Sequence, residues 1–255
     1  MAFFLNSSVP ILTAMLKSRA ADRLIAEIER VRSEGAVAVG LQFEVLEDEC
    51  KTISELRRVF SALDGLPIYF TNYKRGNTTE GVGWDGLTEW LFTAASLGAS
   101  LIDIPADAYN SSDMELTSDP IAIAKQKRIT ADLHSLGTDV LMSSHVLRFA
   151  PKDTVLRIAE EHFSRGADIS KIVTEANNDA ELYENFEISA ELARRYGNRT
   201  LFLCNGTHAR RHRLFAPPLG SAMFLAAENV LTGQMQPTLG EASEILNLAF
   251  GGNLK

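Results

Sequence analysis

The sequence alternates short apolar runs with longer segments in which apolar side chains recur at helical spacing, and this alternation spans nearly the whole chain. The short runs lack a polar face, which is typical of parallel strands that are covered by helices. Glycines such as Gly35, Gly98, Gly137 and Gly166 follow the helical segments and allow the left-handed turn back toward the next strand. The pattern therefore predicts consecutive βα units.

Strands are expected at residues 11–15, 36–45, 66–71, 100–105, 139–143, 167–174 and 200–204, with an eighth within 220–227. Helices are expected at residues 20–34, 53–63, 84–97, 120–136, 154–165, 180–196 and 239–248. Seven or eight such units fit a (β/α)8 TIM barrel, which typically has about 250 residues. Since the 255 residues contain no linker-like segment, we expect a single domain over residues 1–255. A doubly wound sheet is the alternative, but no Gly-x-Gly-x-x-Gly follows the first strand and there is no P-loop.

Charge and cysteine usage limit the partners of the chain. Asp and Glu number 33 against 25 Lys and Arg, and a net charge of −8 argues against nucleic-acid binding. The two cysteines, Cys50 and Cys204, have no metal-binding spacing, so we expect a reducing compartment and no structural metal. The apolar N-terminus is interrupted by Asn6 and Pro10, and its first basic residue is Lys17. It therefore predicts a buried strand rather than a signal peptide or a membrane span, and a cytoplasmic protein.

The longest irregular stretches, residues 72–83, 106–119 and 205–219, all follow strands. In a (β/α)8 barrel these loops form the catalytic face, so polar residues near strand ends are candidate site residues. Lys171 lies between Ser170 and Ile172 in an apolar strand. If its side chain points into the barrel, desolvation favours the neutral, nucleophilic amine that Schiff-base chemistry requires. The alternative is a lysine that reaches solvent or pairs with Asp168.

His145 follows the preceding strand and could transfer protons near neutral pH, although a loop histidine bonded to backbone groups is the alternative. Lys171 and His145 end consecutive strands, so their side chains could meet over the barrel mouth. Arg210, Arg211 and Arg213 follow the seventh strand and could bind a substrate carboxylate. The alternative is a solvated basic loop. A weak nucleic-acid patch is disfavoured because no aromatic residues are interleaved.

Several motifs resemble the type I 3-dehydroquinate dehydratase family, and the resemblance extends over the whole chain. The most specific is residues 166–172, Gly-Ala-Asp-Ile-Ser-Lys-Ile, which resembles the family strand Gly-Ala-Asp-Ile-x-Lys-Ile. Further matches are residues 143–145 with the family's Ser-x-His, Arg213 followed by Gly220 and Ser221, Glu80-Gly81, residues 102–105 with Ile-Asp-x-Glu, and residues 232–234 with Pro-Gly-Gln.

The resemblance implies a (β/α)8 lyase that acts on 3-dehydroquinate or a related cyclic keto acid without a metal or organic cofactor. Lys171 would form an imine with the ring ketone, and His145 would take a proton from the adjacent carbon and then protonate the departing hydroxyl. Glu80 would orient His145, while Arg213 and Gln234 would hold the carboxylate. Closure of residues 232–236 would exclude water. Dimers are common in the family, so a homodimer is expected.

The sequence departs from the family around the substrate. The family's Glu-x-Arg on the second strand corresponds to Gln42 and Glu44, and a binding arginine corresponds to Tyr73 unless a gap brings in Lys74 or Arg75. Pro105 replaces a glutamate, and Thr232 replaces a proline in a loop about two residues shorter. Loss of a charge-assisted hydrogen bond costs about 1.5–3 kcal/mol. Three hypotheses remain: the dehydratase, a divergent lyase or aldolase with another carbonyl substrate, and a non-catalytic binding protein.

Overall fold

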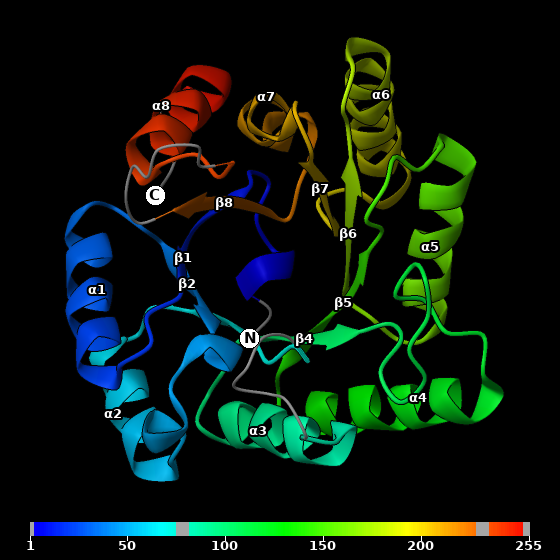
Figure 1. The fold of residues 1–255 in the computed structure, drawn as a ribbon. Coiled ribbons are helices and arrows are strands. Elements are labelled where there is room, and N and C mark those ends of the chain that lie inside the picture. Colours follow the sequence, from blue (N-terminus) through cyan, green and yellow to red (C-terminus); the bar gives the residue numbers. More distant parts are fainter. Residues whose placement is uncertain (1–2, 75–81, 228–234, 252–255) are drawn as a thin grey trace.

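The computed structural model describes residues 3–74, 82–227 and 235–251, and within these residues eight parallel strands form one sheet. The strands are β1 (Ile11–Leu16), β2 (Ala38–Gln42), β3 (Ile68–Thr71), β4 (Leu101–Pro105), β5 (Asp139–His145), β6 (Ile169–Glu175), β7 (Thr200–Asn205) and β8 (Met223–Ala227). Their order is β7-β6-β5-β4-β3-β2-β1-β8. The backbone N–H of Ala222, just before β8, also donates to the carbonyl of Thr200 in β7. The strands thus curve into a nearly closed barrel (Figure 1).

Helices surround the strands and confirm the predicted (β/α)8 architecture (Figure 1). They are α1 (Ala21–Ser33), α2 (Ile53–Ala62), α3 (Trp84–Ser96), α4 (Pro120–Ser135), α5 (Lys152–Ser164), α6 (Asp179–Tyr196), α7 (Ala209–Phe215) and α8 (Leu239–Phe250). Side chains of Thr52, Asp119, Asn178 and Thr238 accept hydrogen bonds from the backbone at the starts of α2, α4, α6 and α8. Such caps stabilise a helix start by satisfying otherwise unpaired N–H groups.

Most predicted boundaries shift by one to three residues, and three differences concern the elements that carry the site. The run expected as a strand over residues 36–45 leaves the sheet after Gln42 and forms a 3-10 turn, Phe43–Val45, whose Phe43 packs into the outer core. β5 continues through His145, which we expected just beyond the strand. Residues 205–219, expected to be irregular, contain α7. Its buried face consists of Ala209, His212 and Arg213, so its helical period is carried mostly by polar residues.

The interior of the barrel is filled by alternate side chains from every strand, as closure of an eight-stranded sheet requires. They are Ile11, Ala38, Tyr69, Leu101, Leu141, Ile169, Leu201, Met223 and others of one buried cluster. Gly40 makes room for two of its neighbours, because a Cβ there would lie 2.2 Å from Met15 Sδ and 3.2 Å from a ring carbon of Tyr69. The interior at this level is therefore a packed, mostly apolar core.

The N-terminal segment belongs to this inner core. A short 3-10 helix, Phe3–Leu5, precedes β1, and Phe4 is 1% exposed in the same cluster as Ile11 and Tyr69. In the view of Figure 1 this helix lies inside the ring of strands. The apolar N-terminus is thus used for packing, with β1 as predicted. Among the described residues, no helix has the length and apolar character needed to cross a membrane.

Replacing Phe4 by Ala should lower the free energy of unfolding by about 3–5 kcal/mol, the usual cost of removing a buried aromatic ring. The control is Leu248→Ala, because Leu248 is 80% exposed and its loss should change stability by less than about 0.5 kcal/mol. Urea unfolding followed by circular dichroism measures both. Equal midpoints for the two variants would mean that the barrel does not depend on Phe4.

Candidate active site

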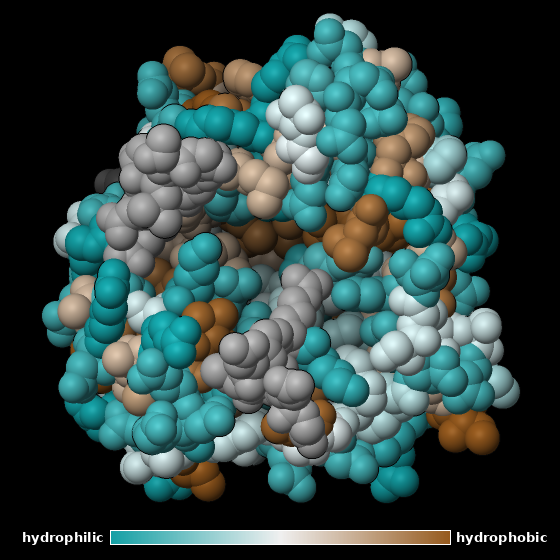
Figure 2. Space-filling model, viewed as in Figure 1, coloured by the Kyte–Doolittle hydropathy of each residue, from teal (hydrophilic) through white to brown (hydrophobic). Residues whose placement is uncertain are grey.

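The candidate catalytic side chains lie inside the barrel, His145 at the C-terminal end of β5 and Lys171 within β6, four residues before the strand ends and not at its end as expected. Ser143 pairs with Lys171 in the parallel register, and His145 pairs with Val173. Since alternate residues of a strand face the same side, Ser143, His145 and Lys171 all face the interior, above the packed layer of Leu141 and Ile169. Hydrophilic side chains cover most of the face seen in Figure 2, and hydrophobic ones line a hollow near its centre.

Lys171 is buried and lies in a polar cluster built from four strands and one loop. Its Nζ donates to the Tyr73 hydroxyl at 2.5 Å, to the Tyr69 hydroxyl at 3.0 Å and to Asp103 Oδ2 at 3.2 Å. Both tyrosines also donate to Asp103 Oδ2, and Ser143 donates to Asp103 Oδ1 at 2.6 Å. The lysine therefore pairs with Asp103 on β4. Asp168, the partner considered from the sequence, instead lies 2.7 Å from His134.

The protonation of this cluster follows from burial and charge. Burial alone would raise the pKa of Asp103, but the Lys171 ammonium and the three hydroxyl donors outweigh it and hold that pKa below its usual range. Burial and the Asp103 charge raise the pKa of Tyr69 and of Tyr73 well above the usual value. Asp103 is therefore a carboxylate, and both phenols are neutral hydrogen-bond donors.

His145 is held by Glu115, from the loop between β4 and α4. One carboxylate oxygen of Glu115 lies 2.5 Å from His145 Nδ1 and accepts from the His145 backbone N–H at 3.0 Å. Glu115 has a φ of 46°, a left-handed conformation that is uncommon for a non-glycine residue and is often found at functional sites. The ring of His145 meets the ring of Tyr73 edge to face, with centroids 5.4 Å apart. Tyr73 thus contacts both His145 and Lys171.

Of the three arginines after β7, only Arg213 faces the barrel. It is 9% exposed, and its guanidinium donates to the Cys204 carbonyl, to Asn205 Oδ1 and to Gln236 Oε1 at 2.8, 2.9 and 2.5 Å. Arg210 and Arg211 are exposed and form ion pairs with Glu241 and Asp179. The expectation of a three-arginine cluster is therefore wrong, because α7 turns two of these side chains outward.

Arg213 is a cation whose hydrogen-bond acceptors among the described residues are neutral. Burial lowers the pKa of Arg213 to about 10, which still leaves it charged at neutral pH. Its three acceptors are amide or peptide oxygens, and no carboxylate of the described residues forms an ion pair with it. Neutral acceptors do not balance its charge, so an anionic group can bind there favourably.

Gln42, Glu44 and Pro105 lie around the same end of the barrel. Gln42 ends β2, and Pro105 ends β4 beside Ser143. Glu44 is buried, and its carboxyl group accepts a hydrogen bond from the Thr71 hydroxyl at 2.9 Å. Burial raises the pKa of Glu44, although hydrogen bonds partly oppose the shift. The expected Glu80, Thr232 and Gln234 lie outside the described residues.

Sequence reasoning did not single out Tyr69, Asp103 or Glu115 as site residues. The sequence did contain a signal for Tyr69 and Asp103, because each is a polar side chain at an inward-facing position of an otherwise apolar strand. Glu115 had no comparable signal, since it lies in a loop and its position depends on the backbone conformation there. Among the described residues, no group of three His, Cys, Asp or Glu side chains is arranged to hold a metal ion.

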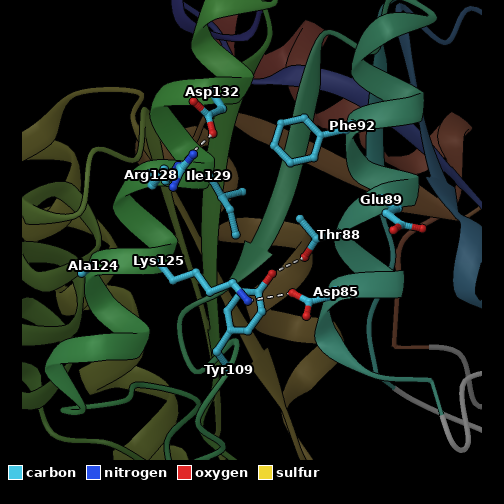
Figure 3. A pocket seen from close by; sticks show the side chains of 10 residues that line it. All are labelled: Asp85, Thr88, Glu89, Phe92, Tyr109, Ala124, Lys125, Arg128, Ile129 and Asp132. Atoms are coloured by element: carbon cyan, nitrogen blue, oxygen red, sulfur yellow. Dashed lines mark hydrogen bonds and ion pairs between the residues drawn. The ribbon is translucent and has the colours of Figure 1, made fainter.

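A separate groove of about 590 Å³ lies outside the barrel between α3 and α4 (Figure 3). Its main polar groups pair with one another: Lys125 Nζ is 2.7 Å from Asp85, Thr88 is 2.8 Å from the Tyr109 hydroxyl, and Arg128 is 3.8 Å from Asp132. This groove contains none of the Lys171 cluster.

Fold and site together define a (β/α)8-barrel protein with its polar cluster on the face that carries the active site in enzymes of this architecture. The type I 3-dehydroquinase family matches residues 12–253, and the chain belongs to this family. It is 27% identical over 205 residues to a 3-dehydroquinate dehydratase of Methanosarcina barkeri, an alignment that covers 78% of this chain and 79% of that protein.

Two solved structures show the same fold. A type I 3-dehydroquinate dehydratase from Clostridium difficile, described with covalently modified comenic acid, superposes with a TM-score of 0.79 at 16% identity, covering 96% of this chain and 94% of that one. A 3-dehydroquinate dehydratase from Geobacillus kaustophilus superposes with a TM-score of 0.78 at 16% identity, covering 98% and 94%.

The histidine beside Arg213 should make stability depend on pH. His212 is fully buried, and burial lowers its pKa from 6.5 to about 3. The unfolded chain therefore binds one more proton than the folded chain between these values, and stability falls as the pH falls through this window. We expect His212→Phe to remove this loss, so its unfolding free energy relative to wild type should rise by about 1.4 kcal/mol per pH unit from pH 6 to 4. Urea titrations at each pH measure it, and a constant difference would contradict the assignment.

Proposed function

We propose that the protein is a dehydratase that acts on 3-dehydroquinate, or on a closely related cyclic keto acid, through an imine on Lys171. The observation that carries the proposal is the pairing of a buried lysine with a histidine–glutamate pair across Tyr73, in a chain of the type I 3-dehydroquinase family. A lysine amine makes a ketone reactive without a metal, because the imine nitrogen accepts electrons from the neighbouring carbon.

The reaction divides into steps that these side chains can carry out. The Lys171 amine attacks the ring ketone, and loss of water from the adduct gives a protonated imine. His145 then removes a proton from the carbon next to the imine, and the electron pair moves toward the nitrogen. The hydroxyl on the following carbon leaves as water with the proton that His145 returns. Hydrolysis of the imine restores Lys171 and releases the enone, so the net change is the loss of one water.

Asp103 and Glu115 would give the two reactive groups their protonation and orientation. Asp103 favours the ammonium form of Lys171, so a proton must leave Nζ before attack on the ketone. The Tyr69 and Tyr73 hydroxyls surround the same nitrogen and can hydrogen-bond to an oxygen that develops there. Glu115 bonds to His145 Nδ1, which leaves Nε2 to exchange the proton and stabilises the imidazolium. Glu80 remains part of the proposal as a second orienting carboxylate.

Arg213 would bind the substrate carboxylate, with Gln234 and Thr232 on a loop over residues 232–236 that excludes water when it closes. The described contacts of Arg213 with neutral acceptors support this role, since a carboxylate would supply the missing negative charge. Gln42, Glu44 and Tyr73 would face the remaining polar groups of the ring.

The altered shell favours a second candidate within the same chemistry, a lyase for a different keto acid. Glu44 stands where the family resemblance places an arginine, and it is a buried carboxyl group bonded to Thr71. A substrate hydroxyl there would meet a carboxyl group instead of a guanidinium. The third possibility, a binding protein without activity, would not explain a lysine paired to Asp103 beside His145.

Borohydride trapping distinguishes these functions. Incubation with 3-dehydroquinate and borohydride should add the reduced ligand to Lys171, detected by peptide mass spectrometry, while enone absorbance should grow without borohydride. Lys171→Ala should abolish both signals, and Lys125→Ala, in the outer groove, should leave them unchanged. An adduct with another keto acid alone would assign the second candidate. If no carbonyl compound forms an adduct, both enzymatic functions are refuted.

Arg213→Ala should lower kcat/KM for the keto acid about 10- to 150-fold, the equivalent of one charge-assisted hydrogen bond. Most of this change should be in KM if the carboxylate contact is equally strong in substrate and transition state. Arg210→Ala is the matched control, because Arg210 lies on the same helix and pairs outward with Glu241. Similar losses in both variants would argue against a specific carboxylate site.

A cytoplasmic location and a homodimer also belong to the proposal, and both rest on the sequence analysis and the family resemblance. Light scattering at several protein concentrations tests the dimer, and fractionation of expressing cells tests the location. A single mass equal to one chain over the whole range would remove the dimer from the proposal.

A further inference from the structure

A buried histidine lies behind the two strands that carry His145 and Lys171. His162, on α5, is fully buried, and its Nε2 and Nδ1 each lie 2.9 Å from a serine hydroxyl, of Ser144 and Ser170 respectively. These serines directly precede His145 and Lys171. Because successive side chains of a strand face opposite sides, the serines point out toward α5 while the reactive groups point into the barrel.

The hydrogen bonds allow one arrangement of protons. The Ser144 hydroxyl donates to the backbone carbonyl of Glu115 at 2.8 Å, and a carbonyl can only accept. Ser144 must therefore accept from His162, which places a proton on Nε2 of His162. Burial lowers the pKa of His162 to about 3, so the ring is neutral and its Nδ1 accepts from the Ser170 hydroxyl.

The residue that directly follows α5, Arg165, also holds the loop that carries Glu115. The Arg165 side chain is 1% exposed and donates to the carbonyls of Ala106 and Thr117 at 2.7 and 2.8 Å, at the two ends of this loop. Glu115 is thus fixed through its own carbonyl by Ser144 and at the loop ends by Arg165. Ser144 lies on β5 and contacts His162 of α5, and Arg165 directly follows α5, which lies on the outside of the barrel (Figure 1).

We infer that His162 is a positioning residue that sets the relative placement of Lys171 and of the His145–Glu115 pair by joining Ser170 to Ser144 behind the strands. This role rests on the proposed function, since it concerns the same reaction. One hydrogen bond of His162 holds Ser170, which directly precedes Lys171 on β6. The other holds Ser144, which directly precedes His145 on β5 and donates to the carbonyl of Glu115.

These hydrogen bonds of His162 matter because a reaction slows steeply when the reacting groups are displaced from one another. A misplacement of about 1 Å can lower a rate about a hundredfold. The register between β5 and β6 is already fixed by backbone hydrogen bonds. His162 adds side-chain bonds that bridge the two strands and the loop, and the backbone ladder cannot supply these.

Substitution of each serine separates the effects of the two hydrogen bonds of His162. We expect Ser170→Ala to slow the trapping of substrate on Lys171 by borohydride, and Ser144→Ala to slow product formation after the imine has formed, in single-turnover experiments. His162→Phe fills the same space without either bond and should slow both steps about 10- to 100-fold, with KM changed by less than about threefold. In the Ser144→Ala/Ser170→Ala background, His162→Phe should have little further effect.

Ile158→Ala is the matched control, because Ile158 lies one turn earlier on α5, is fully buried and belongs to an apolar cluster. It should lower stability while leaving both rates near those of the wild type. Nitrogen-15 spectra of His162 should show a proton on Nε2 from pH 5 to 8, a result that does not require activity.

Unchanged rates in His162→Phe would overturn the positioning role. The role would also be overturned if Ile158→Ala slowed both steps as much as His162→Phe does, or if the proton of His162 were found on Nδ1. If the wild-type protein forms no imine, the proposed function fails and this role fails with it, whereas a reactive wild type beside a fully active His162→Phe refutes the role alone.

Discussion

The ion pair between Lys171 and Asp103 constrains the rest of the barrel. The two side chains are 7% and 0% exposed and lie 3.2 Å apart, and removing each ion from water costs several kcal/mol. Attraction within the pair offsets this cost only when the remaining polar atoms are bonded as well. Ser143, Tyr69 and Tyr73 supply those bonds, so β3, β4, β5 and β6 depend on one another at this level. Loss of either ion would leave an uncompensated charge, typically at a cost of about 3–5 kcal/mol.

This arrangement stabilises the resting protein in a form that is not yet reactive. An ammonium group is not a nucleophile, and Asp103 favours the ammonium form of Lys171. Lys171 is thus stabilised as an ammonium group but must react as an amine. The two neutral phenols reduce this conflict, because they hydrogen-bond to Asp103 without adding charge and remain beside Nζ once it is neutral. A ketone bound between them would meet hydrogen-bond donors at its oxygen and the amine at its carbon. In the proposed mechanism, the same two hydroxyl groups would therefore stabilise the resting ion pair and activate the bound ketone.

The sequence predicted what depends on local periodicity. The barrel, Lys171 and His145 all followed from apolar runs and their ends, because the position of a residue on a parallel strand determines which face of the barrel it reaches. Arg210 and Arg211 were misplaced because α7 buries polar residues, so its helical pattern could not be recognised from hydrophobicity. Glu115 was missed for a different reason: its contact with His145 depends on a left-handed backbone in a long loop, and no local pattern indicates it.

In the proposed site, Arg213 and Glu44 would act in opposite ways on an anionic ligand. Arg213 has no carboxylate partner among the described residues, so it can balance one negative charge on a ligand. An ionised Glu44 would repel an anionic ligand. Burial raises the pKa of Glu44 and so opposes its ionisation. A neutral Glu44 could donate a hydrogen bond, as would the arginine that the family resemblance places at this position. Under the proposed function, the substitution would replace a fixed positive charge by a carboxyl group whose charge depends on protonation, and this difference would bear on which keto acid the site prefers.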